Sequence, residues 1–103
     1  MKGTILVVED DARVALFLRR LLVHNDYQVE TAGTAAAARQ LATELSPDVV
    51  LLDLNLPDAH GHDLMPELLE LVPTSQFIVV TGDASIRSAV KATRRGAADY
   101  LSK

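Results

Sequence analysis

Apolar residues occur along the chain in short runs, separated by longer segments of mixed character. Three runs are continuously apolar, at Ile5–Val8, Val49–Leu52 and Phe77–Val80. Runs of this length without polar alternation are typical of strands that are buried on both faces. Two weaker strand-like stretches lie at Tyr27–Thr31 and Asp99–Leu101. The pattern therefore predicts five strands, at least three of them inside a sheet.

The segments between the predicted strands have helical character. In the first, Val14, Leu18, Leu21 and Leu22 share one apolar face, and the others are Ala35–Leu45, Leu64–Leu71 and Ala84–Arg95. Thr34 is a candidate N-cap of the second helix, and Gly96 is a candidate stop after the fourth. Strands that alternate with helices indicate an α/β domain, with a parallel sheet covered by helices on both faces.

The chain has 103 residues, enough for one domain of modest size, and its 49% hydrophobic and 4% aromatic content makes the core aliphatic. The predicted order ends on its fifth strand at Lys103, so part of one sheet face lacks a covering helix. We therefore expect residues 1–103 to be a single domain, truncated before its last helix. Because large exposed apolar patches are rare on monomers, we also expect self-association, as a homodimer or by exchange of elements.

Composition argues against several kinds of function. The chain has no cysteine, which rules out disulfides and thiolate metal sites and agrees with a reducing cytoplasm. No apolar run is long enough to span a bilayer, and no signal-like region follows Met1. The formal net charge of −4 argues against direct nucleic-acid binding by this domain.

Polar residues are concentrated where the predicted strands end. The first strand is followed by Glu9, Asp10 and Asp11, the third by Asp53, the fourth by Thr81, Gly82 and Asp83, and the fifth by Lys103. In open α/β sheets, ligands bind beyond the carboxyl ends of the strands, where helices leave toward opposite faces. If the first and third strands are neighbours, several carboxylates therefore meet one hydroxyl and one ammonium.

Carboxylates gathered in this way repel one another, and burial strengthens the repulsion. A divalent cation with oxygen ligands resolves the conflict, and Mg²⁺ fits best because it shares its shell with phosphate oxygens. The ammonium of Lys103 and the hydroxyl of Thr81 could hold the other oxygens of a phosphoryl group. A carboxylate can itself accept a phosphoryl group, so Asp53 is a candidate nucleophile.

Four stretches, "ILVVEDD", "LLDLNLPDAHG", "VVTGD" and "GAADYLSK", resemble the signature motifs of bacterial two-component response regulator receiver domains. They occur in the family's order, each at a strand end, and the likeness covers the whole chain. It implies the flavodoxin-like (CheY-like) fold, a doubly wound five-stranded parallel sheet of order 2-1-3-4-5 whose final helix is absent from this chain. It also implies a phosphoacceptor in signalling that is not an enzyme acting on an external substrate.

The resemblance implies a role for each matched residue. Asp53 would accept the phosphoryl group from a sensor histidine kinase or a histidine phosphotransfer protein. Mg²⁺ or Mn²⁺ would be bound directly by Asp10, Asp53 and the backbone carbonyl of Asn55, with Glu9 helping to organise the metal site. Lys103 would contact the phosphoryl group.

The resemblance implies a switch as well. Thr81 would turn inward to the phosphoryl group, and Tyr100 would rotate into the space that Thr81 leaves. Asn55 and Asp83 match the two positions that, in the family, flank the path of the attacking water. With Gly82 beside them, these residues predict a short-lived phosphorylated form. The conformational change would control an output module, which we expect to regulate transcription.

Three other interpretations are open at this point. A degenerate receiver, used only for protein contact, would lack some of the charged groups that this chain retains. A Mg²⁺-dependent phosphohydrolase would need a general acid near the nucleophile and an inserted cap. A flavin-binding domain of flavodoxin type would need a phosphate-binding loop where the first strand is followed by three acidic residues.

Several polar residues have a structural interpretation beside a functional one. Asp11 fits the N-cap of the first helix better than a metal ligand, and Asp58 fits a turn. The histidines show no ligand spacing and are expected at the surface (His24, His60 and His62). Four basic residues recur at helical spacing, either as a solvated face or as a contact for an acidic partner (Arg87, Lys91, Arg94 and Arg95).

Overall fold

The computed structural model describes residues 3–82 and 86–103, which form one five-stranded sheet. All neighbouring strands run parallel, in the order β2-β1-β3-β4-β5. The strands are β1 (Thr4–Val8), β2 (Gln28–Ala32), β3 (Val49–Leu52), β4 (Gln76–Thr81) and β5 (Asp99–Ser102). The predicted strands, their parallel arrangement and their order are confirmed, with every boundary within one residue of the prediction.

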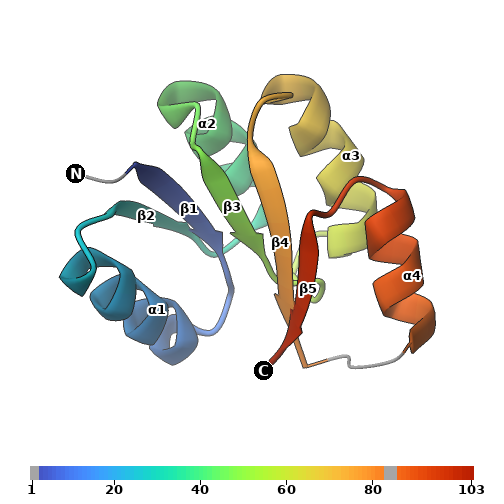
Figure 1. The fold of residues 1–103 in the computed structure, drawn as a ribbon, viewed down its shortest axis with the longest axis horizontal. Helices are drawn as coiled ribbons and strands as arrows, with labels where there is room; N and C mark the ends of the chain where they lie inside the picture. Colours follow the sequence, from blue (N-terminus) through green and yellow to red (C-terminus); the bar gives the residue numbers. More distant parts are fainter. Residues whose placement is uncertain (1–2, 83–85) are drawn as a thin grey trace.

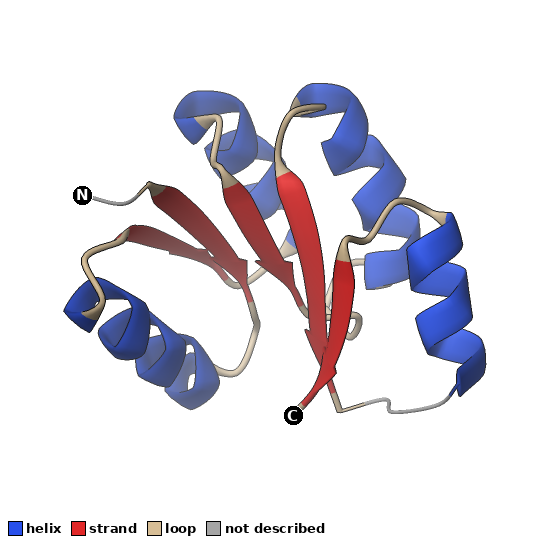
Figure 2. Ribbon diagram, viewed as in Figure 1, coloured by secondary structure: helices blue, strands red, loops and turns tan. Residues whose placement is uncertain are grey.

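Helices cover both faces of the sheet, as Figure 1 shows along the chain and Figure 2 by type of element. Among the described residues, one helix lies on the first face, α1 (Ala12–His24). The second face is covered by α2 (Ala35–Leu45), α3 (Gly61–Leu71) and α4 (Ile86–Arg94). The doubly wound arrangement is thus confirmed. Within the described ranges, no helix combines the length and the apolar character that crossing a bilayer requires.

The larger part of the core lies between the sheet and the three helices of the second face. Strand side chains alternate in direction, so Leu6, Val50 and Phe77 point toward these helices and have almost no exposed surface. α2 contributes three buried alanines, which let the helix approach the sheet closely, and α3 contributes Leu64 and Leu68. Each large side chain buried here stabilises the fold by about 1.5–3 kcal/mol.

The face covered by α1 has a smaller core. Ile5, Val7 and Val29 are buried there, and Leu18 and Leu22 of α1 pack against them. These two leucines lie four residues apart, as expected for the contact stripe of an amphipathic helix. Because this stripe is narrow, α1 covers mainly the part of the sheet that contains β1 and β2.

The other part of this face is exposed. No described helix covers β4 and β5 on this side, so Leu101 is 48% exposed, beside the half-buried Val80 with which it is paired in the sheet. On α1, Phe17 is 65% exposed. The prediction that Leu21 belongs to the buried face of α1 is wrong, because the contact stripe leaves this side chain 47% exposed.

The beginnings of α1 and α2 follow the predicted caps. The Asp11 carboxylate accepts hydrogen bonds from the backbone N–H groups of Arg13 at 2.9 Å and Val14 at 3.4 Å. The Thr34 hydroxyl accepts from the N–H of Ala37 at 3.1 Å. Asp11 thus has the predicted role of N-cap.

The beginning of α3 differs from the prediction. The helix starts at Gly61, three residues before the predicted Leu64, with His60 as N-cap. The N–H of Gly61 donates to the carbonyl of Leu54 at 2.7 Å, so the helix starts directly against the end of β3. A Cβ at Gly61 would lie 2.6 Å from the Leu54 Cα and 2.7 Å from the carbonyl oxygen of Asp53, so only glycine fits.

Candidate functional site

The carboxyl ends of β1 and β3 bring three acidic side chains together. Val8 and Leu52 are partners in the sheet, so the residues that follow them, Glu9 and Asp53, lie next to each other. One carboxylate oxygen from each of Glu9, Asp10 and Asp53 lies within 4.8 Å of the other two. This is the convergence of acids that the sequence predicts.

Burial differs between these acids. Glu9 and Asp53 are each only 4% exposed, whereas Asp10 is exposed. Burial raises the pKa of the Glu9 carboxyl, and hydrogen bonds from Lys103 and from the Asp11 N–H act in the opposite direction. Two buried carboxylates side by side are costly unless a cation compensates them.

Lys103 provides one such cation. Its Nζ lies 2.6 Å from Glu9 Oε2 and 3.1 Å from Asp53 Oδ2. Burial works against the charged ammonium, but the hydrogen bonds to Glu9 and Asp53 outweigh it, so the pKa of Lys103 is raised. The N–H of Lys103 donates to the Thr81 carbonyl at 2.9 Å, which fixes the backbone from which the side chain reaches the acids.

Thr81 and Tyr100 lie on the two strands at this side of the site. Thr81 ends β4 and is fully buried, and its partner in β5 is Ser102. Tyr100, two residues earlier in β5, is half-buried and packs against the larger core. A methyl group at Gly82 would meet no described atom within 4 Å, so the backbone after Thr81 borders open space. Asp83 lies outside the described residues.

The loop after Asp53 is fixed by polar contacts. The N–H of Asn55 donates to Asp53 Oδ1 at 3.2 Å, and Asn55 also pairs with His60 in an isolated bridge. Because Lys103 binds the other carboxylate oxygen, both oxygens of Asp53 have an assigned donor. The nucleophile candidate is therefore held in one orientation.

Asp58 has a role that its position in the sequence did not reveal. Its Oδ1 accepts from the N–H of Ala35 at 2.7 Å, and its Oδ2 accepts from the N–H of Ala36 at 3.2 Å. The hydrogen bond from Ala35 is the main reason why the pKa of Asp58 is lowered. The loop that carries Asn55 is thus attached to the first turn of α2, where a carboxylate also complements the helix dipole. The predicted turn role misses this contact because the partners are 22 and 23 residues away.

The donor set fits a small divalent cation. Glu9, Asp10 and Asp53 offer hard carboxylate oxygens from two adjacent strand ends, with one exposed member through which water molecules can complete the shell. Mg²⁺ and Mn²⁺ prefer such ligands, whereas the described residues offer no thiolate or imidazole at this place. A hollow of about 410 Å³ opens beside Glu9 and Asp10 and is bordered by α1 and β2. It gives a reacting group room to approach the acids.

The prediction of surface histidines is wrong for His62, which is only 3% exposed. Its ring stacks on His60 with centroids 5.1 Å apart, and its Nε2 lies 2.9 Å from the hydroxyl of Ser88 in α4. The His60 ring in turn accepts the N–H of His62 as the cap of α3. Had the helix been predicted from Gly61, the spacing of three residues between His62 and the buried Met65 would have indicated burial.

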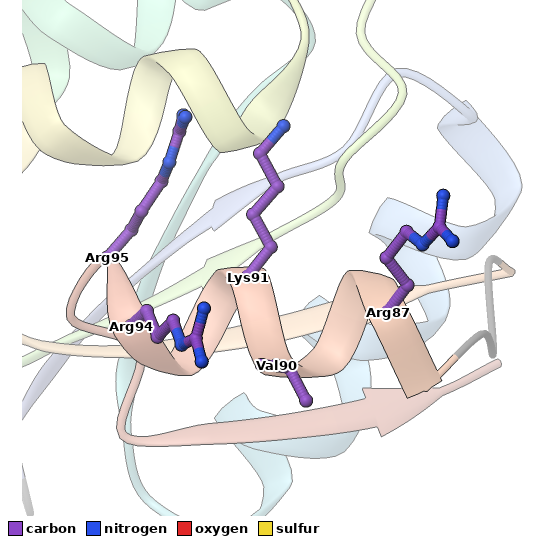
Figure 3. A pocket seen from close by; sticks show the side chains of 5 residues that line it. All are labelled: Arg87, Val90, Lys91, Arg94 and Arg95. Carbon is purple, nitrogen blue, oxygen red and sulfur yellow. The ribbon is translucent and has the colours of Figure 1, made fainter.

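The four basic residues predicted at helical spacing lie on and just after α4. They line a cavity of about 540 Å³ together with Val90, and Figure 3 shows the side chains around it (Arg87, Lys91, Arg94 and Arg95). Among the residues that the structure describes, the lining comes from α4 and Arg95 and includes no acidic side chain. It is therefore a basic surface rather than a part of the acidic site.

Comparison with known proteins identifies what this arrangement resembles. The family model described as response regulator receiver domain matches residues 5–103. The photosynthetic apparatus regulatory protein RegA of Rhodovulum sulfidophilum is 37% identical over 100 residues, covering 97% of this chain and 55% of that protein. The DNA-binding transcriptional regulator NtrC of Azospirillum brasilense is 33% identical over 101 residues, covering 98% of this chain and 21% of that protein. This chain thus spans only part of either relative.

Solved structures agree with the sequence comparison. A response regulator protein from Burkholderia pseudomallei, with a phosphorylated aspartic acid, calcium ion and citrate, has a TM-score of 0.94 and 34% identity, covering 99% of this chain and 60% of that one. The non-phosphorylated HemR receiver domain from Leptospira biflexa has a TM-score of 0.92 and 33% identity, covering 99% and 82%. The likeness extends over the fold and over the strand ends at which the acids lie.

Proposed function

Because this chain belongs to the family of response regulator receiver domains, we propose that it receives a phosphoryl group on Asp53 and switches conformation in response. The donor would be the phosphohistidine of a sensor histidine kinase or of a histidine phosphotransfer protein. The observation that supports this function best is the contact of Lys103 Nζ with both Asp53 and Glu9, at the edge where three acids converge. This grouping is suited to transferring and holding a phosphoryl group.

The transfer itself requires few protein groups. An Asp53 oxygen attacks phosphorus, the bond from phosphorus to the donor's imidazole nitrogen breaks, and that nitrogen keeps the electron pair and binds a proton. Lys103 lies beside the attacking carboxylate and can follow the negative charge onto the phosphoryl oxygens. The buried Thr81 at the end of β4 supplies a hydroxyl donor. The product is this chain's own modified side chain, so the domain acts as a phosphoacceptor and not as an enzyme on an external substrate.

A divalent cation belongs in this proposal. Asp10 and Asp53 would be its direct ligands together with the backbone carbonyl of Asn55, and Glu9 would orient the site. Bound there, Mg²⁺ or Mn²⁺ supplies positive charge that neutralises the phosphoryl oxygens. The adjacent strand ends and the N–H of Asn55 on Asp53 Oδ1 support this assignment, because they hold the ligands close together.

The response would run through Thr81 and Tyr100. When Thr81 turns to donate to the phosphoryl group, space opens beside β5, and Tyr100 can rotate into it. The half-buried position of Tyr100 is compatible with such a movement. Phosphorylation adds about −1.5 to −2 units of charge at pH 7 and shifts an existing equilibrium by differential contacts.

Loss of the phosphoryl group would be governed by Asn55 and Asp83, beside Gly82. Asn55 is exposed and next to the nucleophile, and a side chain at Gly82 would meet no described atom, which leaves room for water. We therefore expect a short-lived phosphorylated form.

The partners follow from the family and from the relatives. Receiver domains work with histidine kinases, and NtrC of Azospirillum brasilense is a DNA-binding transcriptional regulator. For this chain we propose control of a transcriptional output module and a cytoplasmic location, without direct contact of this domain with nucleic acid or membrane. Self-association through the exposed apolar face of α1 and β5 is also part of the proposal.

Intact mass spectrometry tests the central step. Acetyl phosphate with Mg²⁺ should add one phosphoryl group to the chain, and the adduct should be absent from Asp53→Ala. Asp99→Asn, which removes an exposed carboxylate at the start of β5, is the matched control and should still be modified. Chelation of Mg²⁺ should prevent the reaction. An adduct that persists in Asp53→Ala would refute the assignment of the nucleophile.

A further inference from the structure

Of the α4 side chains that the structure describes, few make apolar contacts with the rest of the domain. Among these side chains, Ser88 and Ala92 are buried, and neither is large. α3, by comparison, buries Leu64, Met65 and Leu68 in the main core. Since segments with little buried apolar surface are the ones that move most easily, polar contacts decide much of the position of α4.

Those polar contacts join α4 to the first turn of α3. The His62 Nε2 and the Ser88 Oγ lie 2.9 Å apart, and both side chains are buried. Arg95, the residue after α4, donates from Nη1 to the His62 carbonyl at 2.7 Å and to Asp63 Oδ1 at 3.3 Å. Figure 3 shows the Arg95 side chain extending from the end of α4 toward α3.

The geometry of these contacts is specific. Ser88 lies in the first turn of α4 and Arg95 just after its last turn, so the two contacts lie at opposite ends of the helix. Both reach the same short segment, His62 and Asp63. A hydrogen bond is made or lost over a small displacement, unlike a broad apolar contact, so this arrangement favours one position of α4.

The first turn of α3 is in turn fixed to the acidic site. Gly61 donates its N–H to the Leu54 carbonyl at 2.7 Å, and its Cα lies so close to the Asp53 carbonyl that no Cβ fits. The His60 ring accepts the N–H of His62. An unbroken series of contacts therefore leads from the backbone of Asp53 to both ends of α4.

We propose that His62, Ser88 and Arg95 form a polar clamp that holds α4 against the start of α3 and couples its position to Asp53. This inference rests on the proposed function, because it concerns how phosphorylation is passed on. The three residues are positioning residues: they do not contact the phosphoryl group. Phosphorylation moves α4 only by loosening the clamp or by shifting the α3 turn that carries it.

Amide hydrogen exchange tests the clamp in the 1–103 chain. The variant His62→Leu/Ser88→Ala removes both members of the buried pair, so no polar atom of the pair is left without its partner. Arg95→Gln, at the surface, removes the other contact without a change in the core. Thr93→Ala and Arg94→Gln are matched controls, because they remove a hydroxyl and a guanidinium from α4 for which the described structure gives no hydrogen bond or ion pair with α3.

Before phosphorylation, we expect exchange in residues 86–95 to be about tenfold faster in both clamp variants and unchanged in the controls. Exchange in β1 and β3 should stay slow, which excludes general unfolding. After treatment with acetyl phosphate, the controls should show a change in α4 exchange, whereas the clamp variants should show less than half of that change. The mass spectrum should report a similar yield of the Asp53 adduct in all samples.

Two results would overturn the clamp. One is α4 exchange at the control rate in both clamp variants before any phosphorylation. The other is an undiminished change of α4 exchange on phosphorylation in those variants. Absence of the Asp53 adduct from every sample would instead refute the proposed function, and the measurements before phosphorylation would still decide whether the clamp holds α4.

Discussion

Lys103 binds two buried acids at once, and Glu9 reaches it with the longer of the two common acidic side chains. The ammonium lies closer to Glu9 Oε2, at 2.6 Å, than to Asp53 Oδ2, at 3.1 Å. The lysine thus stabilises the site, and in the proposed function the same side chain would also contact the phosphoryl group.

Lys103→Met separates these contributions. We expect phosphorylation of Asp53 from acetyl phosphate to slow by about a hundredfold, because a donor to the transferred group is lost. The fold should lose stability as well, since two buried carboxylates are left without their cation. Time-resolved intact mass measures the first effect and urea unfolding the second.

Lys91→Met is the control, because it removes an exposed ammonium from α4. This variant should change neither the rate of phosphorylation nor the stability toward urea. A phosphorylation rate in Lys103→Met equal to that of Lys91→Met would show that the ammonium has no part in the transfer.

Asp58 makes the stability of the fold depend on pH in the acidic range. Its pKa in the folded chain lies below the ordinary value of 3.8, chiefly because of the hydrogen bond from the N–H of Ala35. The folded state therefore favours the charged carboxylate. Its contribution to stability is complete once the pH is about one unit above the unfolded pKa of 3.8. It is lost as the pH falls through the lowered pKa.

Asp58→Asn should remove this dependence. At pH 7 the variant should be less stable than the original chain, and the difference should shrink as the pH falls below about 3.8. Urea midpoints measured between neutral and acidic pH check it, with Asp99→Asn as the comparison. A difference that is constant over the whole pH range would contradict the assigned contact of the Asp58 carboxylate with the first turn of α2.

At the scale of elements, continuously apolar runs predict the three central strands β1, β3 and β4, whereas the more exposed edge strands β2 and β5 give only weaker strand-like stretches. The acids Glu9, Asp10 and Asp53 are predicted as a group because parallel strands place their carboxyl ends at one edge. Lys103 and Thr81 follow from the same rule. What the sequence predicts well is therefore what depends on strand position.

Contacts that do not follow from strand position could not be predicted. The start of α3 depends on the fit of Gly61 against the end of β3. In the sequence alone, Gly61 and the histidines on either side of it are more typical of a loop than of a helix. The burial of His62 and the hydrogen bonds of Asp58 to the first turn of α2 depend on partners more than 20 residues away. The local pattern would indicate the burial of His62 only with the start of α3 already known, and it contains nothing on the contact of Asp58.

Gly61→Ala tests the importance of the close approach. Its Cβ would meet backbone atoms at 2.6 and 2.7 Å, so α3 must move away from β3. We expect a loss of about 1–3 kcal/mol of stability and slower phosphorylation of Asp53. Gly82→Ala is the matched control, because its Cβ would meet no described atom within 4 Å. Equal urea midpoints for the two variants would argue against a tight contact.

At the scale of the molecule, the two faces of the sheet are unequal. The face of α2, α3 and α4 buries most of the core, whereas the described part of the other face leaves Phe17 and Leu101 at 65% and 48% exposure. Exposed apolar surface of this kind promotes association.

We expect the 1–103 chain to associate with itself through the exposed apolar face of α1 and β5. Phe17→Glu/Leu101→Glu should shift the sedimentation profile toward monomer, because charges would have to be buried in the contact. Leu71→Glu is the control, since Leu71 is a leucine of α3 that is 47% exposed. A monomeric profile of the original chain at high concentration would refute the expectation.

The basic surface of α4 makes the distribution of charge over the domain uneven. Of ten basic and fourteen acidic residues, four basic and no acidic ones fall in residues 86–95, so the remainder carries six positive against fourteen negative charges. This uneven distribution of charge would lead a negatively charged partner to approach the domain preferentially at α4. Phosphorylation of Asp53, as proposed above, would make the rest of the domain more negative and leave the charge of residues 86–95 unchanged. The preference for approach at α4 would then become stronger on phosphorylation and weaker in concentrated salt.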